Sequence, residues 1–133
     1  MRTVFADTFY FLALLDSKEK QHGQAVRAAQ DTGLRIVTTE WVLAEFGDAY
    51  CRPADRADFI AFYHALTKNP RARIIPADTA LFQRGLELFE KRQDKCWSLT
   101  DCLSFVCMRE EGLTEALTGD KHFEQAGFAV LLK

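Results

Sequence analysis

The sequence predicts an α/β fold in which a parallel sheet of about five strands is covered by helices on both faces. Short apolar runs of β type alternate with longer helical stretches along the 133 residues. Strands separated by helices of this length need crossover connections, and crossovers join parallel strands. The composition, 48% hydrophobic and 27% charged, suits one ordinary core. We therefore expect a single domain over residues 1–133.

The strands are short apolar runs. The first ends at Asp7, a third is centred on Ile74 and Ile75, and Gly119 permits a tight turn after the fourth. The expected strands cover residues 3–6, 34–38, 72–76, 116–118 and 128–132.

The helices fill the stretches between these runs. Apolar residues surround Asp101 and mark its helix as central and buried. A short last helix ends near Gly127. The expected helices cover residues 8–16, 19–32, 40–51, 54–68, 79–93, 99–111 and 121–125.

Charge and cysteine usage exclude several classes of protein. Lys and Arg number 17 and Asp and Glu 19, for a formal charge of −2, so bulk charge does not make the chain a polyanion binder. Nucleic acid would need local basic patches, or metal ions that bridge acidic groups to phosphate. The four cysteines lack CxxC spacing, and no zinc site is expected. Cys102 and Cys107 should be buried.

The main apolar stretch near the start, residues 8–15, is too short to span a bilayer. No signal-peptide pattern precedes it. We therefore expect a cytoplasmic protein with no membrane association.

Two carboxylates follow predicted strands. Asp7 directly follows the first strand, and Asp120 follows the fourth by two residues. Sites in parallel α/β sheets form beyond the carboxyl ends of the strands. The alternative for each is a helix N-cap, which contributes about 1 kcal/mol. His122, close to Asp120, is expected to be packed or solvent-facing rather than a ligand or base.

Two further carboxylates lie on apolar helices. At about 100° per residue, Glu45 falls inside the arc that contains Trp41, Val42 and Phe46. A buried carboxylate needs a metal, a partner or a proton, and the alternative is a Glu at the helix edge that reaches water. Asp101 fits a capping box with Ser98. Such an acid in the first turn can cap the helix and also face a cleft.

Together the four acids suggest one acidic pocket. Ionised carboxylates in close contact repel and raise one another's pKa, and divalent cations would cancel that charge. Oxygen ligands suit Mg²⁺ or Mn²⁺. A pair of such ions about 3.5–4 Å apart activates water and stabilises the leaving oxygen in phosphodiester hydrolysis.

The chain resembles PIN-domain ribonucleases, in particular the VapC-like toxins of prokaryotic toxin–antitoxin pairs. The resemblance covers nearly the whole chain, and the ordered set of motifs is more specific than any one of them. The matching pieces are residues 4–8 (VFADT), 38–45 (TTEWVLAE), 98–101 (SLTD) and 117–123 (LTGDKHF), followed by Gly127 and Phe128.

The resemblance implies a three-layer α/β/α sandwich and Mg²⁺- or Mn²⁺-dependent cleavage of single-stranded RNA. It makes Asp7 and Asp101 the main metal ligands, with Glu45 and Asp120 completing the catalytic pocket directly or through water. Thr8 and Thr118 match hydroxyl positions near that pocket and could orient ligands or phosphate. The resemblance also implies a homodimer and a cognate antitoxin that covers the cleft.

The sequence therefore predicts a metal-dependent endoribonuclease, the toxin of a toxin–antitoxin pair. Three alternatives remain: a PIN-like RNA-processing nuclease outside a toxin system, a non-catalytic interaction module whose acids only cap helices, and a phosphatase with Asp7 as nucleophile. The last is disfavoured because Phe9 stands where such enzymes place a second acid. The basic side chains Arg71 and Arg73 are expected on a solvated face, with phosphate contact as the alternative.

Overall fold

The computed structural model describes residues 1–133 and contains five strands and seven helices. Every predicted strand and helix is present, with ends that differ from the predicted ones by a few residues. The strands are β1 (Arg2–Ala6), β2 (Leu34–Thr39), β3 (Ala72–Ile75), β4 (Glu115–Leu117) and β5 (Ala129–Val130). The helices are α1 (Thr8–Leu15), α2 (His22–Gln30), α3 (Glu40–Asp48), α4 (Arg56–Thr67), α5 (Thr79–Lys91), α6 (Leu99–Glu110) and α7 (Lys121–Gln125).

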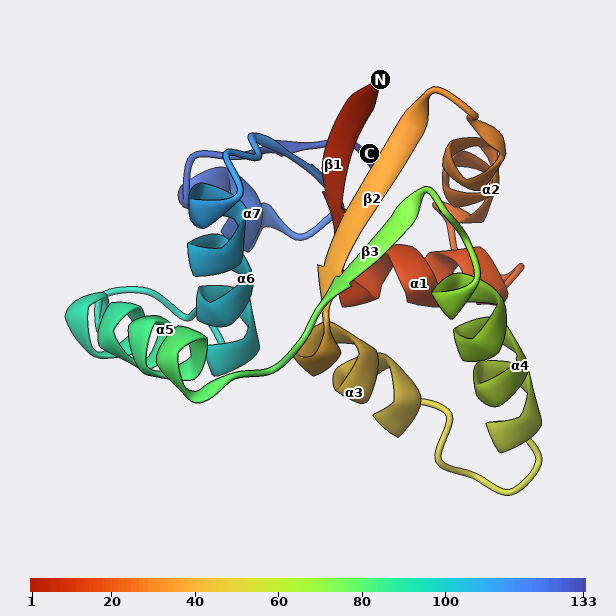
Figure 1. The fold of residues 1–133 in the computed structure, drawn as a ribbon, viewed down its shortest axis with the longest axis horizontal. Helices are drawn as coiled ribbons and strands as arrows, with labels where there is room; N and C mark the ends of the chain where they lie inside the picture. Colours follow the sequence, from red (N-terminus) through yellow and green to blue (C-terminus); the bar gives the residue numbers. More distant parts are fainter.

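The strands form one sheet in the order β3-β2-β1-β4-β5, and all four neighbouring pairs are parallel. In Figure 1, α1, α2 and α4 lie to one side of the sheet, and α5, α6 and α7 lie to the other. Helix α3 lies below the ends of β1 and β2. This arrangement confirms the predicted α/β/α sandwich with a parallel sheet.

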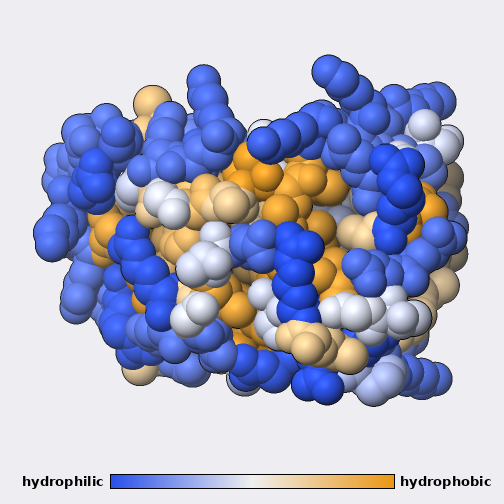
Figure 2. All heavy atoms as spheres, turned by 90° about the horizontal axis from the view of Figure 1, so that it is seen from above, coloured by the Kyte–Doolittle hydropathy of each residue, from blue (hydrophilic) through white to orange (hydrophobic).

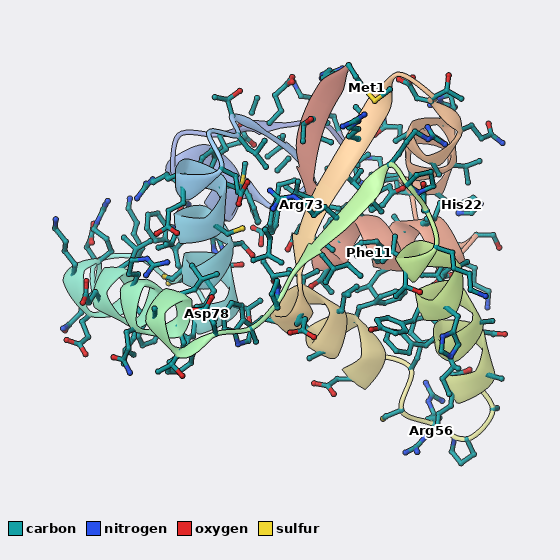
Figure 3. The ribbon with its side chains drawn as sticks, viewed as in Figure 1. Met1, Phe11, His22, Arg56, Arg73 and Asp78 are labelled. Carbon is teal, nitrogen blue, oxygen red and sulfur yellow. The ribbon has the colours of Figure 1, made fainter.

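The core has an aromatic cluster on each side of the central strand β1, whose Val4, Phe5 and Ala6 are fully buried. On the α6 and α7 side, Phe105 meets Phe123 at 4.9 Å between ring centroids. On the other side, Phe11 of α1 (labelled in Figure 3) stacks on the α3 residue Phe46 at 5.3 Å. A strand covered on both faces is typical of a parallel sheet, because its crossover helices lie on both sides.

The surface seen in Figure 2 is mostly hydrophilic. Figure 2, which views the molecule from above, shows an apolar area in the middle of that face between hydrophilic outer parts. The helices are too short or too polar to cross a membrane. Cys102 and Cys107 are buried, as predicted.

The sheet order reverses direction between β1 and β4. From β1 the chain first adds β2 and then β3 on one side, and only afterwards adds β4 and β5 on the other. At such a reversal the loops that leave two adjacent strands run to opposite faces, and a crevice opens beyond their carboxyl ends. Asp7 leaves β1 and Thr118 leaves β4 at this point, because Ala6 pairs with Leu117.

Candidate active site

The four predicted acids, Asp7, Glu45, Asp101 and Asp120, meet in one open pocket of about 500 Å³ at the reversal point. They come from the end of β1, from α3, from the first turn of α6 and from the turn after β4. The residues that line the pocket are Asp7, Thr8, Phe9, Leu12, Glu45, Asp101, Gly119, Asp120 and Lys121. The fold therefore brings together carboxylates up to 113 positions apart, the separation of Asp7 and Asp120.

Asp7 is the buried member of the group, with only 6% of its surface exposed. It stands at the N-cap position of α1, but its side chain caps nothing. Its Oδ2 instead accepts a hydrogen bond of 2.9 Å from the Thr118 hydroxyl. Burial raises the pKa of Asp7 to about 7, and the charges of Asp101 and Glu45 add to this rise. Helix capping alone therefore does not account for this carboxylate.

Asp101 caps its helix and also faces the pocket, as the sequence predicted. The Ser98 hydroxyl accepts the Asp101 backbone N–H, and Asp101 Oδ2 accepts the Ser98 N–H, at 2.9 and 3.1 Å. The same Oδ2 lies 3.0 Å from Nδ1 of His122. The contacts from the Ser98 N–H and from the His122 ring both end on Oδ2, so Oδ1 of Asp101 stays available to a ligand.

Asp120 is held by its own turn. Its Oδ1 accepts the backbone N–H of His122 at 2.9 Å, which caps the short helix α7. Its own N–H donates to the Thr118 hydroxyl at 3.1 Å. Since that hydroxyl donates to Asp7, Thr118 connects two of the pocket acids through one oxygen atom.

Glu45 lines the pocket but is exposed, so the predicted burial is wrong. The buried side of α3 consists of Val42, Leu43 and Phe46, while Trp41 is only half-buried. The apolar arc of α3 is thus centred farther from Glu45 than the sequence suggested. The alternative stated for this residue, a position at the helix edge in contact with water, is what the structure has.

Thr8 has a buried hydroxyl with no hydrogen-bond partner, although the residue lines the acidic pocket. A buried hydroxyl without a partner costs free energy, about 1–3 kcal/mol when nothing replaces the lost bond with water. The oxygen has almost no accessible surface, so in this structure it does not face the open part of the pocket.

Gly119 is required for close approach rather than for the turn conformation that the sequence suggested. Its φ angle is not positive, unlike those of Gly112 and Gly127. A Cβ at position 119 would lie 2.6 Å from the Phe9 ring and 3.0 Å from the Leu132 carbonyl oxygen. Phe9 therefore packs over the backbone of the turn that carries Asp120.

Three residues at the site were missed by sequence reasoning. His122 contacts Asp101 and also lies 3.5 Å from Oδ1 of Asp120, and Lys121 and Phe9 line the pocket. Two of the three adjoin Asp120 in the sequence, and Phe9 follows Asp7 by two positions. Proximity to an acid was a signal, but the direction of each side chain was not readable from the pattern.

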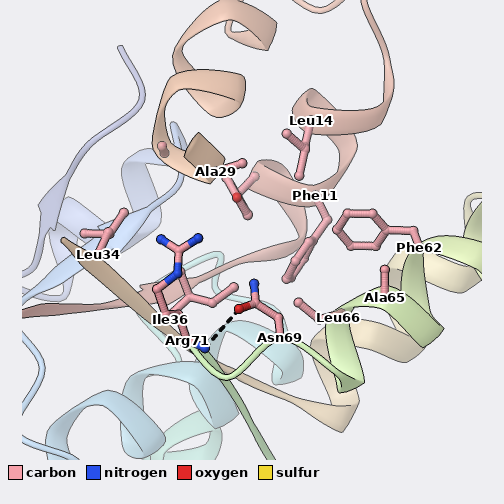
Figure 4. A pocket seen from close by; sticks show the side chains of 12 residues that line it. Phe11, Leu14, Ala29, Leu34, Ile36, Phe62, Ala65, Leu66, Asn69 and Arg71 are labelled. Atoms are coloured by element: carbon pink, nitrogen blue, oxygen red, sulfur yellow. Dashed lines mark hydrogen bonds between the residues drawn. The ribbon is translucent and has the colours of Figure 1, made fainter. Parts of the chain in front are cut away.

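The basic pair Arg71 and Arg73 does not line the acidic pocket. Arg73 forms an ion pair with Glu111 near the end of α6 (Figure 3). Arg71 lines a separate pocket of about 140 Å³, where 10 of the 12 lining residues are hydrophobic (Figure 4). Its backbone N–H donates to the Asn69 side chain there at 2.9 Å. That apolar pocket contains no carboxylate and does not share the chemistry of the acidic one.

The donor set of the acidic pocket fits a hard divalent cation. The four carboxylates offer oxygen ligands, which Mg²⁺ and Mn²⁺ prefer. The ligand atoms of Asp101, Asp120 and His122 lie within 4.8 Å of one another, which is close enough to surround one ion. Burial, with a smaller effect of the Asp101 and Glu45 charges, disfavours the ionised form of Asp7, and a bound cation would offset that cost.

Comparison with known protein families shows to which family the chain belongs. The sequence matches the PIN domain over residues 4–129. The chain belongs to the PIN-domain family. The PIN domain is 29% identical over 126 residues to the 23S rRNA-specific endonuclease VapC20 of Mycobacterium tuberculosis, an alignment that covers 94% of this chain and 95% of that one.

Solved structures agree with this assignment. The crystal structure of Mycobacterium tuberculosis VapC20, described as a sarcin-ricin loop cleaving toxin, matches this PIN domain with a TM-score of 0.87 and 25% identity, covering 98% of this chain and 99% of that one. The DNA-bound VapBC complex from Salmonella typhimurium matches with a TM-score of 0.71 and 14% identity, over 98% of each chain, which supports the fold alone. The predicted resemblance to VapC-like PIN domains is confirmed.

Proposed function

We propose that this PIN domain is a divalent-metal-dependent endoribonuclease that hydrolyses phosphodiester bonds of single-stranded RNA. The observation that carries the proposal is the convergence of four carboxylates from distant segments in one open pocket, where Asp7 is the buried one. A non-catalytic interaction module is not expected to bring four carboxylates together, because their mutual repulsion lowers stability unless cations offset it.

In this proposal Asp7 and Asp101 are the principal ligands of Mg²⁺ or Mn²⁺, and Glu45 and Asp120 complete the pocket directly or through water. A bound ion supplies positive charge beside the scissile phosphate and lowers the pKa of a water molecule. The protein contributes by holding the carboxylate oxygens of Asp7 and Asp101 in place. Asp7 is held by Thr118, and Asp101 is held by the Ser98 backbone, before any substrate arrives.

In this proposal, residues on the rim of the pocket contact the substrate. Lys121 is the only basic residue that lines it, and its exposed ammonium can contact an RNA phosphate. Thr8 lines the pocket, and its hydroxyl could orient a ligand or a phosphate oxygen after the side chain turns toward the pocket. The open shape of the pocket suits an unpaired strand or loop, whose backbone is accessible from several sides.

The similarity to VapC20, which is described as a toxin, supports a toxin role. A cognate antitoxin as partner and a homodimer as the assembly belong to the same proposal and rest on the resemblance to VapC-like toxins. A structured ribosomal RNA loop is then the first substrate to examine, because VapC20 is described as cleaving the sarcin-ricin loop. The alternative within the same chemistry is an RNA-processing nuclease outside a toxin system.

The nuclease proposal is tested by incubating metal-stripped protein with a single-stranded RNA and with a sarcin-ricin loop oligonucleotide. Cleavage should need added Mg²⁺ or Mn²⁺. Asp101→Asn should reduce it by roughly a hundredfold or more, because several kcal/mol of charge stabilisation depend on the acidic ligands. The matched control is Asp58→Asn, at an exposed position on α4 outside the pocket. Undiminished cleavage by Asp101→Asn would refute the assigned role.

The toxin proposal needs a separate test. Induced expression of the wild-type protein should arrest bacterial growth, and expression of Asp101→Asn should not. Co-expression of the neighbouring open reading frame should restore growth if that frame encodes the antitoxin. Cleavage in vitro together with unaffected growth would favour the processing nuclease.

A further inference from the structure

His122 connects two acids of the pocket that come from different parts of the chain. Its backbone N–H donates to Oδ1 of Asp120 at 2.9 Å, and its ring Nδ1 lies 3.0 Å from Oδ2 of Asp101. Asp101 begins α6, whereas Asp120 follows β4, so 19 positions separate them in the sequence. One residue therefore contacts two pocket carboxylates that come from different segments of the chain.

The contact between the His122 ring and Asp101 indicates which ring nitrogen carries a proton. An ionised carboxylate only accepts hydrogen bonds, so the short contact to Asp101 requires the proton on Nδ1. The ring is partly buried, with 23% of its side chain exposed. A nitrogen that carries a proton has no lone pair for a metal ion, so Nδ1 acts as a donor to Asp101 in this arrangement and not as a ligand.

The contact also selects which oxygen of Asp101 remains free. The Ser98 N–H and the His122 ring both bind Oδ2. Two donors on one oxygen hold the carboxylate plane in a single orientation, and Oδ1 is the atom left for a cation. Partners of this kind fix the direction of metal ligands, and their loss typically weakens metal binding or activity 10–100-fold.

We propose that His122 is a positioning residue of the metal site: its Nδ1–H holds Oδ2 of Asp101, and its backbone N–H holds Oδ1 of Asp120. This inference rests on the proposed function, because it assigns the role toward the cation that the acids hold. The pair of contacts distinguishes His122 from a residue that only packs, since both contacts end on pocket carboxylates.

The test compares three substitutions in the full chain. His122→Asn places an amide N–H where Nδ1 stands, His122→Gln places it one methylene farther out, and His122→Ala removes the donor. Mn²⁺ affinity is measured by calorimetry, and kcat and KM are measured for RNA cleavage. Thermal melting of each metal-free variant checks that the fold persists.

The expected result is a 10–100-fold weaker Mn²⁺ affinity and a similar fall in kcat for His122→Ala and His122→Gln, with KM for RNA unchanged. His122→Asn should stay within about threefold of the wild type, because only this variant restores the donor at the Nδ1 position.

Two outcomes would overturn the inference: wild-type affinity in His122→Ala, or equal losses in His122→Asn and His122→Ala. Each of them leaves the nuclease proposal standing, provided that the wild type binds Mn²⁺ and cleaves RNA. A wild type that does neither would instead overturn the proposed function, and the positioning role with it.

Discussion

The hydroxyl of Thr118 donates to Oδ2 of Asp7 across 2.9 Å and joins residues 111 positions apart in the sequence. Thr118 is fully buried, and its hydroxyl also accepts the backbone N–H of Asp120. The bond to Thr118 lowers the pKa of Asp7 and offsets part of the effect of burial. This oxygen therefore contributes both to the stability of the fold and to the charge state of the pocket.

Thr118→Val should destabilise the protein by about 1–3 kcal/mol, because it leaves the Asp120 N–H and an Asp7 oxygen buried without a partner. It should also raise the pKa of Asp7 further. Urea denaturation and titration of the Asp7 carboxyl by nuclear magnetic resonance measure the two effects. Thr118→Ser should retain most of the stability, and Thr114→Val, at an exposed position, serves as the control. A Thr118→Val protein as stable as Thr118→Ser would contradict the role assigned to the hydroxyl.

The raised pKa of Asp7 predicts how stability depends on pH without metal. The carboxyl loses its proton near pH 7 in the folded state but near its ordinary value of 3.8 when unfolded. Between these values the folded state binds more protons, so the free energy of unfolding falls as pH rises. Above pH 7 the full cost of the buried charge is present.

Asp7→Asn removes that cost. In the presence of a chelator, the stability of the variant relative to the wild type should increase by about 2 kcal/mol when the pH is raised from 5 to 8. Urea denaturation at the two pH values measures this difference, with Asp58→Asn as the control. Saturating Mn²⁺ should reverse the order by stabilising only the wild type. A difference that shrinks toward pH 8 would show that burial does not govern this carboxyl.

Gly119→Ala should distort the pocket, because the new methyl would lie 2.6 Å from the Phe9 ring and 3.0 Å from the Leu132 carbonyl oxygen. We expect a loss of about 1–3 kcal/mol, measured by urea denaturation. The double variant Gly119→Ala with Phe9→Leu should recover part of it. Gly23→Ala is the matched control, since its methyl would meet only an Arg27 side-chain atom at 3.5 Å. Equal stability of the two Gly→Ala variants would count against the close approach of Phe9.

Lys121→Ala tests the rim of the pocket and depends on the proposed nuclease activity. Loss of one phosphate contact should raise KM for RNA several-fold at low salt and reduce the salt dependence of binding, with little change in kcat. Steady-state kinetics at two salt concentrations measure this effect. Lys91→Ala, on the exposed end of α5, is the control. A fall in kcat at constant KM would instead place Lys121 in the chemical step.

The sequence predicted the sheet and most of the site because both follow from local rules. Asp7 and Asp120 are positioned by the ends of β1 and β4, and Asp101 by a capping box that the structure contains. Glu45 was harder to place, because a helical wheel gives the width of an apolar arc but not the direction in which the helix packs. Its pocket position depends on how α3 lies against the end of the sheet, which is a tertiary property.

His122 and Gly119 show a second limit. The ring of His122 reaches Asp101 only because α6 and the turn after β4 converge, and nothing within either segment specifies that contact. Gly119 was interpreted as a turn glycine, although the structure requires it because Phe9 packs against it. In both cases the deciding neighbour is remote in the sequence.

The reversal of strand order between β1 and β4 has a consequence for synthesis on the ribosome. Asp7 is translated early, yet its hydrogen-bond partner Thr118 and the fourth acid, Asp120, leave the exit tunnel only after more than a hundred further residues. A nascent or truncated polypeptide that lacks β4 cannot assemble the acidic crevice. If the proposed nuclease activity is correct, hydrolysis begins only after β4 and Asp120 have left the tunnel and joined β1.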